Sequence, residues 1–295
     1  MGAADVIPGV SGGTIAFITG IYEEFVHALQ SIGSSFNLLL KFKISLFWKN
    51  INGNFLLVIF AGIVTSLLSL AKLITLTLYE HPIWIWSFFF GLILISAPLV
   101  LRKVKNWSFT KIIFGLFGLS FAYLITILAP AQTSSEWYMI LLSGMVAICA
   151  MVLPGISGAF VLLLLGKYTF MMNALVEMDW IVILIFASGC VMGLILFSKL
   201  LAWILDHYHD ATLCLLAGFM VGALNKIWPW REVIEYSVNE KGKQIPVLDQ
   251  SVLPWNYLSV TGKDPQIFHA ILLAAFGILL VIIIEKIAIG FKTNS

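Results

Sequence analysis

The chain has 295 residues, of which 60% are hydrophobic and only 11% are charged, and its formal net charge is +2. Soluble domains carry about a quarter charged residues, so this composition excludes an ordinary soluble fold and predicts a protein embedded in lipid. The small net charge gives no reason to expect a nucleic-acid partner. Three cysteines lie in separate apolar segments without the spacing of a metal site or a disulfide, and no metal or cofactor is expected.

The first apolar segment runs from Ala3 to Leu29 and is interrupted by Pro8 and Gly9. Proline removes a backbone donor and glycine permits a tight turn, so a helix is expected to stop here. Ser11 is placed to cap the helix that restarts after the break. Because the chain opens inside this segment, we expect a short N-terminal stretch to precede Met1.

The segment from Ser31 to Asn54 mixes apolar residues with Lys41, Lys43 and Lys49. Such a mixture is typical of a helix that lies on the cytoplasmic surface of the membrane. An ordinary loop is the alternative.

Six uninterrupted apolar runs follow, each long enough to cross a bilayer, which takes about 20 helical residues. Between the third run and the fourth, Trp137 to Val176 forms a second broken segment, interrupted at Pro154 and Gly155. The six predicted spans are Phe55 to Leu78, Ile83 to Leu101, Phe109 to Leu128, Ile181 to Leu205, Ala211 to Trp228 and Phe268 to Ile289.

The two broken segments are similar in sequence. Ala4 to Leu29 aligns without gaps with Ala150 to Leu175, and ten of the 26 positions are identical. This similarity predicts an internal repeat within a single integral membrane domain (1–295), with repeat one at 1–130 and repeat two at 131–295. The identical pairs are Ala4/Ala150, Val6/Val152, Pro8/Pro154, Gly9/Gly155, Ser11/Ser157, Gly12/Gly158, Gly20/Gly166, Tyr22/Tyr168, Ala28/Ala174 and Leu29/Leu175.

The relative orientation of the two halves follows from counting their spans. If each broken segment returns to its own side, each half crosses the membrane an odd number of times, and the halves are inverted. Basic residues before the first span and after the second predict that these loops are cytoplasmic, which leaves 129–136 and 225–267 outside. The expected fold is an all-α multi-pass membrane protein with an inverted-topology repeat. Each half is a Pro-Gly-broken re-entrant hairpin plus three transmembrane helices.

The two breaks form the predicted binding site. Backbone that leaves a helix at membrane depth is tolerated only where protein or a wet cavity satisfies it. Each helix that restarts presents free N–H groups and the positive end of its dipole, and the two ends are expected to meet near the midplane as an anion site. The alternative is that both breaks are kinks that let helices pack closely. The predicted cradle consists of Pro8, Gly9, Ser11, Gly12, Gly13, Thr14, Pro154, Gly155, Ser157 and Gly158.

Charged residues near span ends are further candidates. Lys72 and Lys199 occupy corresponding positions of the repeat, at opposite ends of their spans. Each is interpreted either as a cation that attracts phosphate or as a side chain that snorkels to the interface. The acidic and histidine-rich cluster 206–210 is expected to be a solvated turn and not a metal site. The candidates for binding a coupling ion are Glu23, Glu24 and Asp5.

Two classes of enzyme fit the sequence poorly. Both breaks match the Gly-x-Ser-Gly pattern around the serine of rhomboid proteases, at Ser11 and Ser157. That chemistry needs one serine and a histidine base on a neighbouring helix, whereas here the serine is duplicated and most histidines fall at span ends. A lipid-phosphate phosphatase needs arginines in a phosphate-binding set, and neither Arg102 nor Arg231 has that context. No catalytic residue is assigned.

The first motif resembles the signature of a known membrane family. Met1 to Thr14 reads Met-Gly-Ala-Ala-Asp-Val-Ile-Pro-Gly-Val-Ser-Gly-Gly-Thr and is followed by Gly20-Ile21-Tyr22-Glu23. This stretch resembles the bacterial and archaeal family catalogued as domain of unknown function 368, and Leu153 to Gly158 resembles its second signature. The resemblance covers essentially the whole chain. It departs at the N-terminus, where the family has a short helical lead.

That resemblance implies a transport function. Members are assigned as polyprenyl-phosphate transporters, which return undecaprenyl phosphate to the cytoplasmic leaflet for envelope synthesis. It implies a polyprenyl phosphate partner and a location in the cytoplasmic (inner) membrane. Moving a negative charge inward against the membrane potential costs about 2.3 kcal/mol per 100 mV, so protons or sodium are candidates for co-transport. The alternatives are an ion-coupled transporter of a small soluble anion and a scaffold for envelope enzymes.

Overall fold

The structure is a computed structural model that describes residues 1–5, 10–128, 130–131, 133–238 and 244–293. The first half contains α1 (Gly2–Asp5), α2 (Gly12–Ile18), α3 (Tyr22–Ser34), α4 (Phe36–Leu40), α5 (Ile44–Asn50), α6 (Gly53–Glu80), α7 (Pro82–Leu101) and α8 (Phe109–Ile127). The second half contains α9 (Trp137–Val152), α10 (Gly158–Leu164), α11 (Tyr168–Glu177), α12 (Trp180–His207), α13 (His209–Ala223), β1 (Arg231–Val238), β2 (Gln244–Ser251), α14 (Pro254–Thr261) and α15 (Ile267–Thr293).

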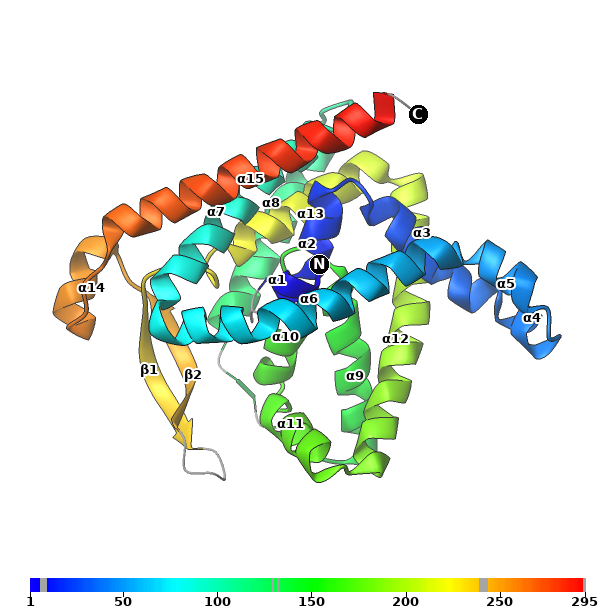
Figure 1. The fold of residues 1–295 in the computed structure, drawn as a ribbon, viewed down its shortest axis with the longest axis horizontal. Helices are drawn as coiled ribbons and strands as arrows, with labels where there is room; N and C mark the ends of the chain where they lie inside the picture. The colour runs from blue at the N-terminus through cyan, green and yellow to red at the C-terminus, as the bar shows by residue number, and fades with distance from the viewer. Residues whose placement is uncertain (6–9, 129, 132, 239–243, 294–295) are drawn as a thin grey trace.

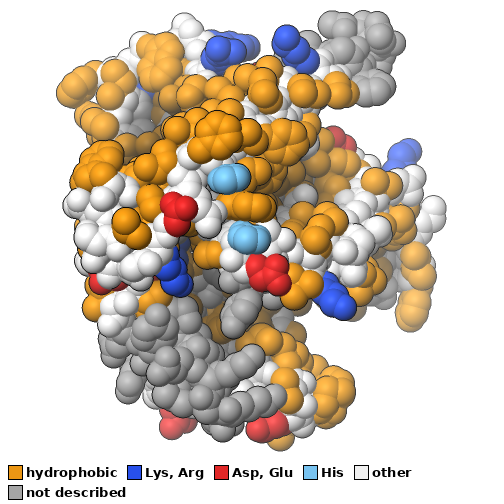
Figure 2. Space-filling model, turned by 60° about the vertical axis from the view of Figure 1, so that its left-hand side comes forward, with side chains coloured by type: hydrophobic (Ala, Val, Ile, Leu, Met, Phe, Trp, Pro, Cys, Tyr) orange, Lys and Arg blue, Asp and Glu red, His pale blue; other side chains and the backbone are white. Residues whose placement is uncertain are grey.

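The chain is mostly helical, and its long helices match the predicted spans. Five helices, α6, α7, α8, α12 and α15, are long and apolar enough to cross a membrane, and the bent pair α10 and α11 makes a sixth if it is counted as one span. Figure 2 shows hydrophobic side chains over much of one face of the molecule, with charged side chains scattered between them. Soluble proteins rarely expose apolar surface on this scale. A multi-pass membrane protein is therefore confirmed.

Two predictions about the second half are wrong. The predicted span from Ala211 to Trp228 is helical only to Ala223, because the next residues turn toward polar partners; the Asn225 amide donates to the Thr126 hydroxyl at 2.7 Å. The loop that follows contains an antiparallel hairpin, β1 paired with β2, and the short helix α14. The fold is thus mostly helical but not all-α.

The segment between the first broken segment and α6 is helical. α4 and α5 are short, and the side chains of Phe42, Ile44 and Trp48 are exposed. Figure 1 shows these helices projecting from the rest of the molecule. The helical interpretation of this segment is confirmed, whereas its position on the membrane surface stays a prediction.

α7 and α13 lie at the centre of the helix bundle and contact each other. α7 packs against α15, and α13 packs against α8; α12 packs against α9, and α6 against α1. These pairings are unchanged when α7 is exchanged with α13, α8 with α15, α6 with α12 and α1 with α9. Figure 1 shows the α12–α13 turn and the C-terminus toward one end of the molecule, and the β-hairpin toward the other.

The closest helix contacts occur at glycines. A Cβ atom added to Gly118 of α8 would overlap the carbonyl oxygen of Leu215 in α13, and one added to Gly91 of α7 would overlap that of Ala274 in α15. In membranes, helices associate mainly through close packing, which small residues permit. These glycines therefore set how closely the two halves approach.

We expect Gly118→Ala to lower the free energy of unfolding by about 1–3 kcal/mol, because the added methyl group forces α8 and α13 apart. Gly115→Ala, one turn earlier on α8, is the control, since its added Cβ would lie 3.5 Å from the Cys214 carbonyl oxygen, an ordinary contact. Thermal unfolding in detergent, followed by tryptophan fluorescence, measures both variants. Equal stability of the two would contradict this account of the interface.

Candidate functional site

The second broken segment turns twice. α9 ends at Val152, and α10 begins at Gly158 after the Pro154-Gly155 break, where Gly155 has φ +88°. α10 ends after seven residues, and the chain bends by 107° around Gly166, which has φ +65°. Glycine adopts this left-handed backbone without steric cost. The predicted break is confirmed, and the second turn is an addition that the motif comparison did not predict.

The first broken segment follows a similar course. α2 also has seven residues and ends before Gly20, the counterpart of Gly166, which has φ +73°. Ser11 is the N-cap of α2, as predicted, and its hydroxyl oxygen accepts the Gly13 N–H at 3.1 Å. The predicted site residues Pro8 and Gly9 lie outside the residues that the structure describes.

The two breaks are joined by direct hydrogen bonds. The Ser11 hydroxyl lies 3.1 Å from the Met151 carbonyl oxygen and 3.0 Å from that of Leu153, so it donates to the end of α9. In the other direction, the Gly155 N–H donates to the Thr14 hydroxyl oxygen at 3.0 Å. Ser11 and Thr14 are 1% and 0% exposed. The two motifs are therefore in contact, whereas an anion site near the membrane midplane stays a prediction. We refer to these five residues as the interlocked breaks.

Three amides of the first motif, those of Gly12, Gly13 and Thr14, already have partners. The Gly12 N–H donates to the Asp5 carboxylate at 2.7 Å, the Gly13 N–H to the Ser11 hydroxyl, and the Thr14 N–H to the Ser11 carbonyl at 3.0 Å. Ser157 differs from its counterpart Ser11: within the described residues its side chain does not cap α10, and it lines a small cavity. The two repeat-related serines thus have different surroundings.

The motif glycines lie where no side chain fits. A Cβ atom on Gly13 would lie 2.7 Å from a backbone oxygen of α9, and one on Gly158 would lie 2.6 Å from another. A Cβ on Gly155 would lie 2.9 Å from a backbone oxygen of α13. This geometry supports close packing as the role of the glycines. It does not account for the buried hydroxyl and carboxyl groups beside them.

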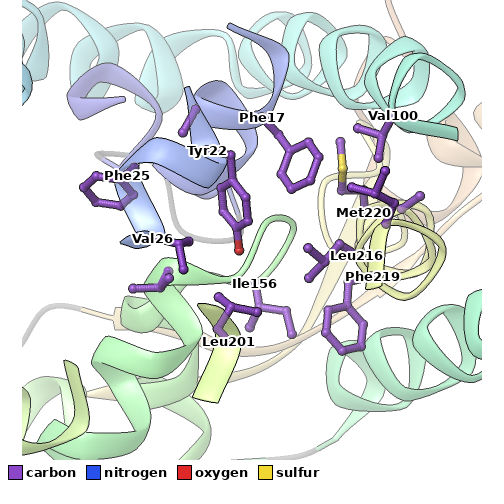
Figure 3. Packing of buried hydrophobic residues seen from close by; sticks show 14 of the residues in the cluster. Phe17, Tyr22, Phe25, Val26, Val100, Ile156, Leu201, Leu216, Phe219 and Met220 are labelled. Atoms are coloured by element: carbon purple, nitrogen blue, oxygen red, sulfur yellow. The ribbon is translucent and has the colours of Figure 1, made fainter. Parts of the chain in front are cut away.

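A buried tyrosine adds an apolar contact next to the interlocked breaks. Tyr22 is 2% exposed, and its ring centre lies 4.3 Å from that of Phe17. Figure 3 shows the ring of Tyr22 pointing from the first-half helices toward Ile156 of the second break, with Phe219 of α13 on the far side of Ile156. Among the described residues, the Tyr22 hydroxyl has no hydrogen-bond partner.

Asp5 is the coupling candidate that lies at the breaks. One carboxylate oxygen accepts the Gly12 N–H, and the other is buried without a partner in the part of the chain that the structure describes. A Cβ atom on Gly12 would lie 2.5 Å from that second oxygen, so glycine is needed for the approach. A buried carboxylate oxygen without a partner is costly unless a proton or a cation satisfies it.

A wide cleft of about 700 Å³ opens at the C-terminal end of α2, between α2 and α7. We call it the α2–α7 cleft. Its cations are Arg102 and Lys103, and the Lys103 ammonium lies 5.9 Å from the centre of the Phe17 ring. Its carboxylates are Glu23, Glu24 and Glu285.

Glu23 and Glu24 are exposed in this cleft and have partners. Glu23 pairs with His209 at 3.2 Å, and Glu24 accepts from the Asn52 amide at 2.7 Å. His209 belongs to the 206–210 turn, which is therefore tied to its neighbours and not simply solvated. Further ion pairs of the turn join Asp206 to His27, Asp210 to Lys111, and His209 to Asp210.

Lys72 and Lys199 are exposed on α6 and α12. They line neither the α2–α7 cleft nor the cavity beside Ser157. The structure therefore does not bring them together with the interlocked breaks. Their exposure fits snorkelling as well as attraction of phosphate at the membrane surface.

A second group of charges lies on the hairpin side of the breaks, and we call Lys226, Arg231 and Asp249 the hairpin-side cluster. Asp249 of β2 pairs with Lys226 at 2.8 Å and with Arg231 at 2.8 Å. Burial disfavours the Asp249 carboxylate, but the Arg231 hydrogen bond and the Lys226 charge outweigh it, and the pKa of Asp249 lies below its usual value. Lys226 lines the same small cavity as Ser157, with its ammonium 4.7 Å from the Phe160 ring centre.

This cluster was missed at the level of sequence. Lys226 falls inside a predicted apolar span, Arg231 was considered only as part of a phosphatase site, and Asp249 belongs to an unpredicted hairpin. The sequence signal that could have indicated it is Lys226, a lysine at the end of an apolar run. Its anionic partner lies 23 positions along the chain and becomes a neighbour only through strand pairing.

Comparison with known proteins identifies the family of this chain. The family model described as "VCA0040-like: Undecaprenyl phosphate translocase-like" matches residues 1–245. The chain belongs to this family. It is 45% identical over 289 residues to a polyprenyl-phosphate transporter of Vibrio cholerae, covering 98% of this chain and 94% of that protein. It is 33% identical over 248 residues to a polyprenyl-phosphate transporter of Staphylococcus aureus, covering 78% and 83% of the two chains. No solved structure matches it significantly.

We expect Thr14→Val to lower the free energy of unfolding by about 1–3 kcal/mol, because it leaves the buried Gly155 N–H without an acceptor. Thr14→Ser is the matched control, since it keeps the hydroxyl oxygen that accepts this bond. Thermal unfolding of both variants in detergent provides the measurement. If valine were as well tolerated as serine, the interlocked breaks would not be held by this bond.

Proposed function

We propose that this protein moves polyprenyl phosphate, with undecaprenyl phosphate as its substrate, across the cytoplasmic membrane. The lipid carrier is returned to the inner leaflet for the synthesis of envelope polymers. One observation carries the proposal: the interlocked breaks lie at the contact between the two halves, with a cation-bearing cleft on one side and a cation-bearing cavity on the other. Membership of the translocase-like family and the names of the two relatives support it.

The proposed substrate has two parts with different requirements. A phosphate head needs polar groups and cations along its path, whereas a polyprenyl tail is stable in lipid. The interlocked breaks supply the polar groups, and the apolar outer faces of the helices allow the tail to remain in the bilayer. In the conformation described here the α2–α7 cleft is the wide opening, so it is the place where a head is bound or released.

We propose that residues 1–130 and 131–295 are inverted repeats that enclose this path. The helix pairing supports this, because it is unchanged when the helices of one half are exchanged with those of the other. The repeated turns at Gly20 and Gly166 support it as well. Re-entrant hairpins at the two broken segments follow from that symmetry. Movement of one half against the other would open the path alternately to the two sides.

Proton coupling follows from the charges of the α2–α7 cleft. Arg102 and Lys103 attract a phosphate head, but three carboxylates line the same cleft and repel it. Protonation of a carboxyl group removes that repulsion and offsets the cost of carrying negative charge inward. Of the three coupling candidates, Glu23 and Glu24 line this cleft, whereas Asp5 lies at the breaks. Asp5 is favoured because its second carboxylate oxygen lacks a partner within the described residues, so it can take up a proton where the head passes.

The alternative is transport of a small soluble anion through the same breaks. It predicts a closed, water-lined path and competition by inorganic phosphate. A scaffold without transport explains the apolar spans but gives no reason for two buried hydroxyls to join two broken helices.

We expect Arg102→Gln/Lys103→Gln to slow translocation by about tenfold or more, because each cation contributes a charge-assisted hydrogen bond to the head. Proteoliposomes containing polyprenyl phosphate are treated with an external phosphatase. Without translocation it reaches only the outer-leaflet heads, and with translocation it reaches essentially all of them. Lys105→Gln, in the same loop but outside the cleft, is the control.

Wild-type rates in the Arg102/Lys103 variant would contradict the role of the cleft. If the wild-type protein translocates no lipid under any imposed proton or sodium gradient, transport of a small soluble anion is favoured instead. Lys72→Gln/Lys199→Gln is measured in the same assay, and an unchanged rate would leave these two lysines as snorkelling residues.

We expect Asp5→Asn to remove the dependence of translocation on an imposed pH gradient, because the amide cannot carry the proton. Glu23→Gln and Glu24→Gln are compared in parallel and should keep that dependence. The measurement is the initial translocation rate with and without a pH gradient. A variant at Asp5 that responds to the gradient like the wild type would exclude Asp5 as the proton carrier.

A further inference from the structure

The hairpin-side cluster has the geometry of an oxyanion clamp. Arg231 contacts both carboxylate oxygens of Asp249, from Nε at 2.8 Å and from Nη2 at 2.9 Å, and Lys226 donates to one of them at 2.8 Å. Two-point contact from a guanidinium, reinforced by an ammonium, is how proteins bind carboxylate and phosphate groups alike. The carboxylate of Asp249 therefore occupies a position that suits a phosphate oxygen pair.

The charges of the cluster do not balance. Lys226 and Arg231 bring two positive charges, their side chains are 15% and 9% exposed, and Asp249 supplies one negative charge. Largely buried charges are costly without full compensation. A phosphate monoester carries about −1.5 to −2 near neutral pH, so it matches the two cations better than one carboxylate does.

The cluster also adjoins the second break. Lys226, Ser157 and Gly155 line one small cavity, whose volume of about 10 Å³ has room for roughly one water molecule. A phosphate group does not fit in this cavity. A head that binds the Lys226 ammonium must therefore take the place that the Asp249 carboxylate occupies on it.

The element that carries Asp249 can move at low cost. β1 and β2 form a sheet of two strands, and a two-stranded hairpin is only marginally stable by itself. Two tryptophan N–H groups hold its base: Trp228 donates to the Val252 carbonyl and Trp230 to that of Pro265, each at 2.8 Å. Release of Asp249 breaks neither of these bonds.

We propose that Lys226 and Arg231 form a second binding site for the phosphate monoester head of the lipid, and that Asp249 is an internal anion which the head displaces. The site lies on the hairpin side, opposite the α2–α7 cleft, and is predicted to be on the outer side of the membrane. This inference rests on the proposed function, because it supplies the point at which the head is captured before it reaches the breaks.

The test is binding of farnesyl phosphate, a short polyprenyl phosphate, to the purified protein in detergent, measured by isothermal titration calorimetry. All variants carry Arg102→Gln/Lys103→Gln, so that the α2–α7 cleft contributes less. We expect Asp249→Asn to tighten binding about fivefold or more, because it removes the competing anion. Lys226→Gln and Arg231→Gln should each weaken it about tenfold, and Lys226→Arg should retain it.

Asp210→Asn is the matched control, since the Asp210–Lys111 pair at the opposite end has a similar distance of 2.7 Å and similar side-chain exposures of 16% and 20%. It should not change the affinity. If Asp249 were only structural, its replacement would leave two buried cations unpaired and would weaken binding or leave it unchanged. Either result overturns the proposal.

A second measurement needs no variant at the cluster. Amide hydrogen exchange in β2 should become faster when farnesyl phosphate is added to the wild-type protein, and farnesol should have no such effect. Unchanged exchange in β2 would overturn the displacement of Asp249 even if a variant failed to fold.

The lipid and free phosphate are separated by a third titration. Inorganic phosphate should bind much more weakly than farnesyl phosphate. Equal affinities would overturn the proposed lipid substrate, while loss of both in Lys226→Gln would still support the anion site. Conversely, if the wild-type protein translocates lipid but Asp249→Asn does not change the affinity for farnesyl phosphate, only the second site is overturned.

Discussion

Backbone that leaves the helical conformation inside a membrane must find its hydrogen-bond partners within the protein, because lipid offers none. Here each broken segment supplies hydrogen-bond partners to the other. The Ser11 hydroxyl donates to the end of α9, and the Thr14 hydroxyl accepts the Gly155 N–H. The position of α2 is therefore fixed by the second half, and that of the second break by the first. The glycine contacts of α7 and α13 hold the helices around these two segments close together.

The same bonds give the site its lack of symmetry. Ser11 is engaged by α9, whereas its counterpart Ser157 lies against a cavity. Asp5 is matched in the repeat by Met151, so the carboxyl group beside the breaks belongs to the first half alone. A structure built from two similar halves thus offers different chemistry on the two sides of their contact. A difference of this kind allows the two sides to bind one charged group with unequal affinity.

Much of the fold was predictable, because apolar runs and Pro-Gly interruptions are local signals. The bounds of α7, α8 and α12 follow the predicted spans closely, and the pairing of the two motifs followed from ten identical positions. The end of α13 was not predictable, because Leu224 to Trp228 continues the apolar run. The bond from Asn225 to Thr126, beside which the helix ends, joins residues that are far apart in the sequence. The hairpin was missed because charged and polar residues interrupt its strands and because Pro246 within β2 argues against a strand. The hairpin-side cluster depends on that hairpin and could not be assembled from the sequence.

The insertions of the two halves differ: α4 and α5 belong only to the first, and the β-hairpin only to the second. Two identical halves would give a lipid the same affinity and the same crossing rate from either leaflet. Different insertions allow the two faces to bind the lipid with different affinities. The transport rates in the two directions can then differ when the lipid is abundant. Microscopic reversibility nevertheless forbids them from changing the final distribution of the lipid. Where the lipid carrier accumulates is decided by the membrane potential, by any coupled ion and by consumption of the lipid, so the inserted segments can change only the rates of transport.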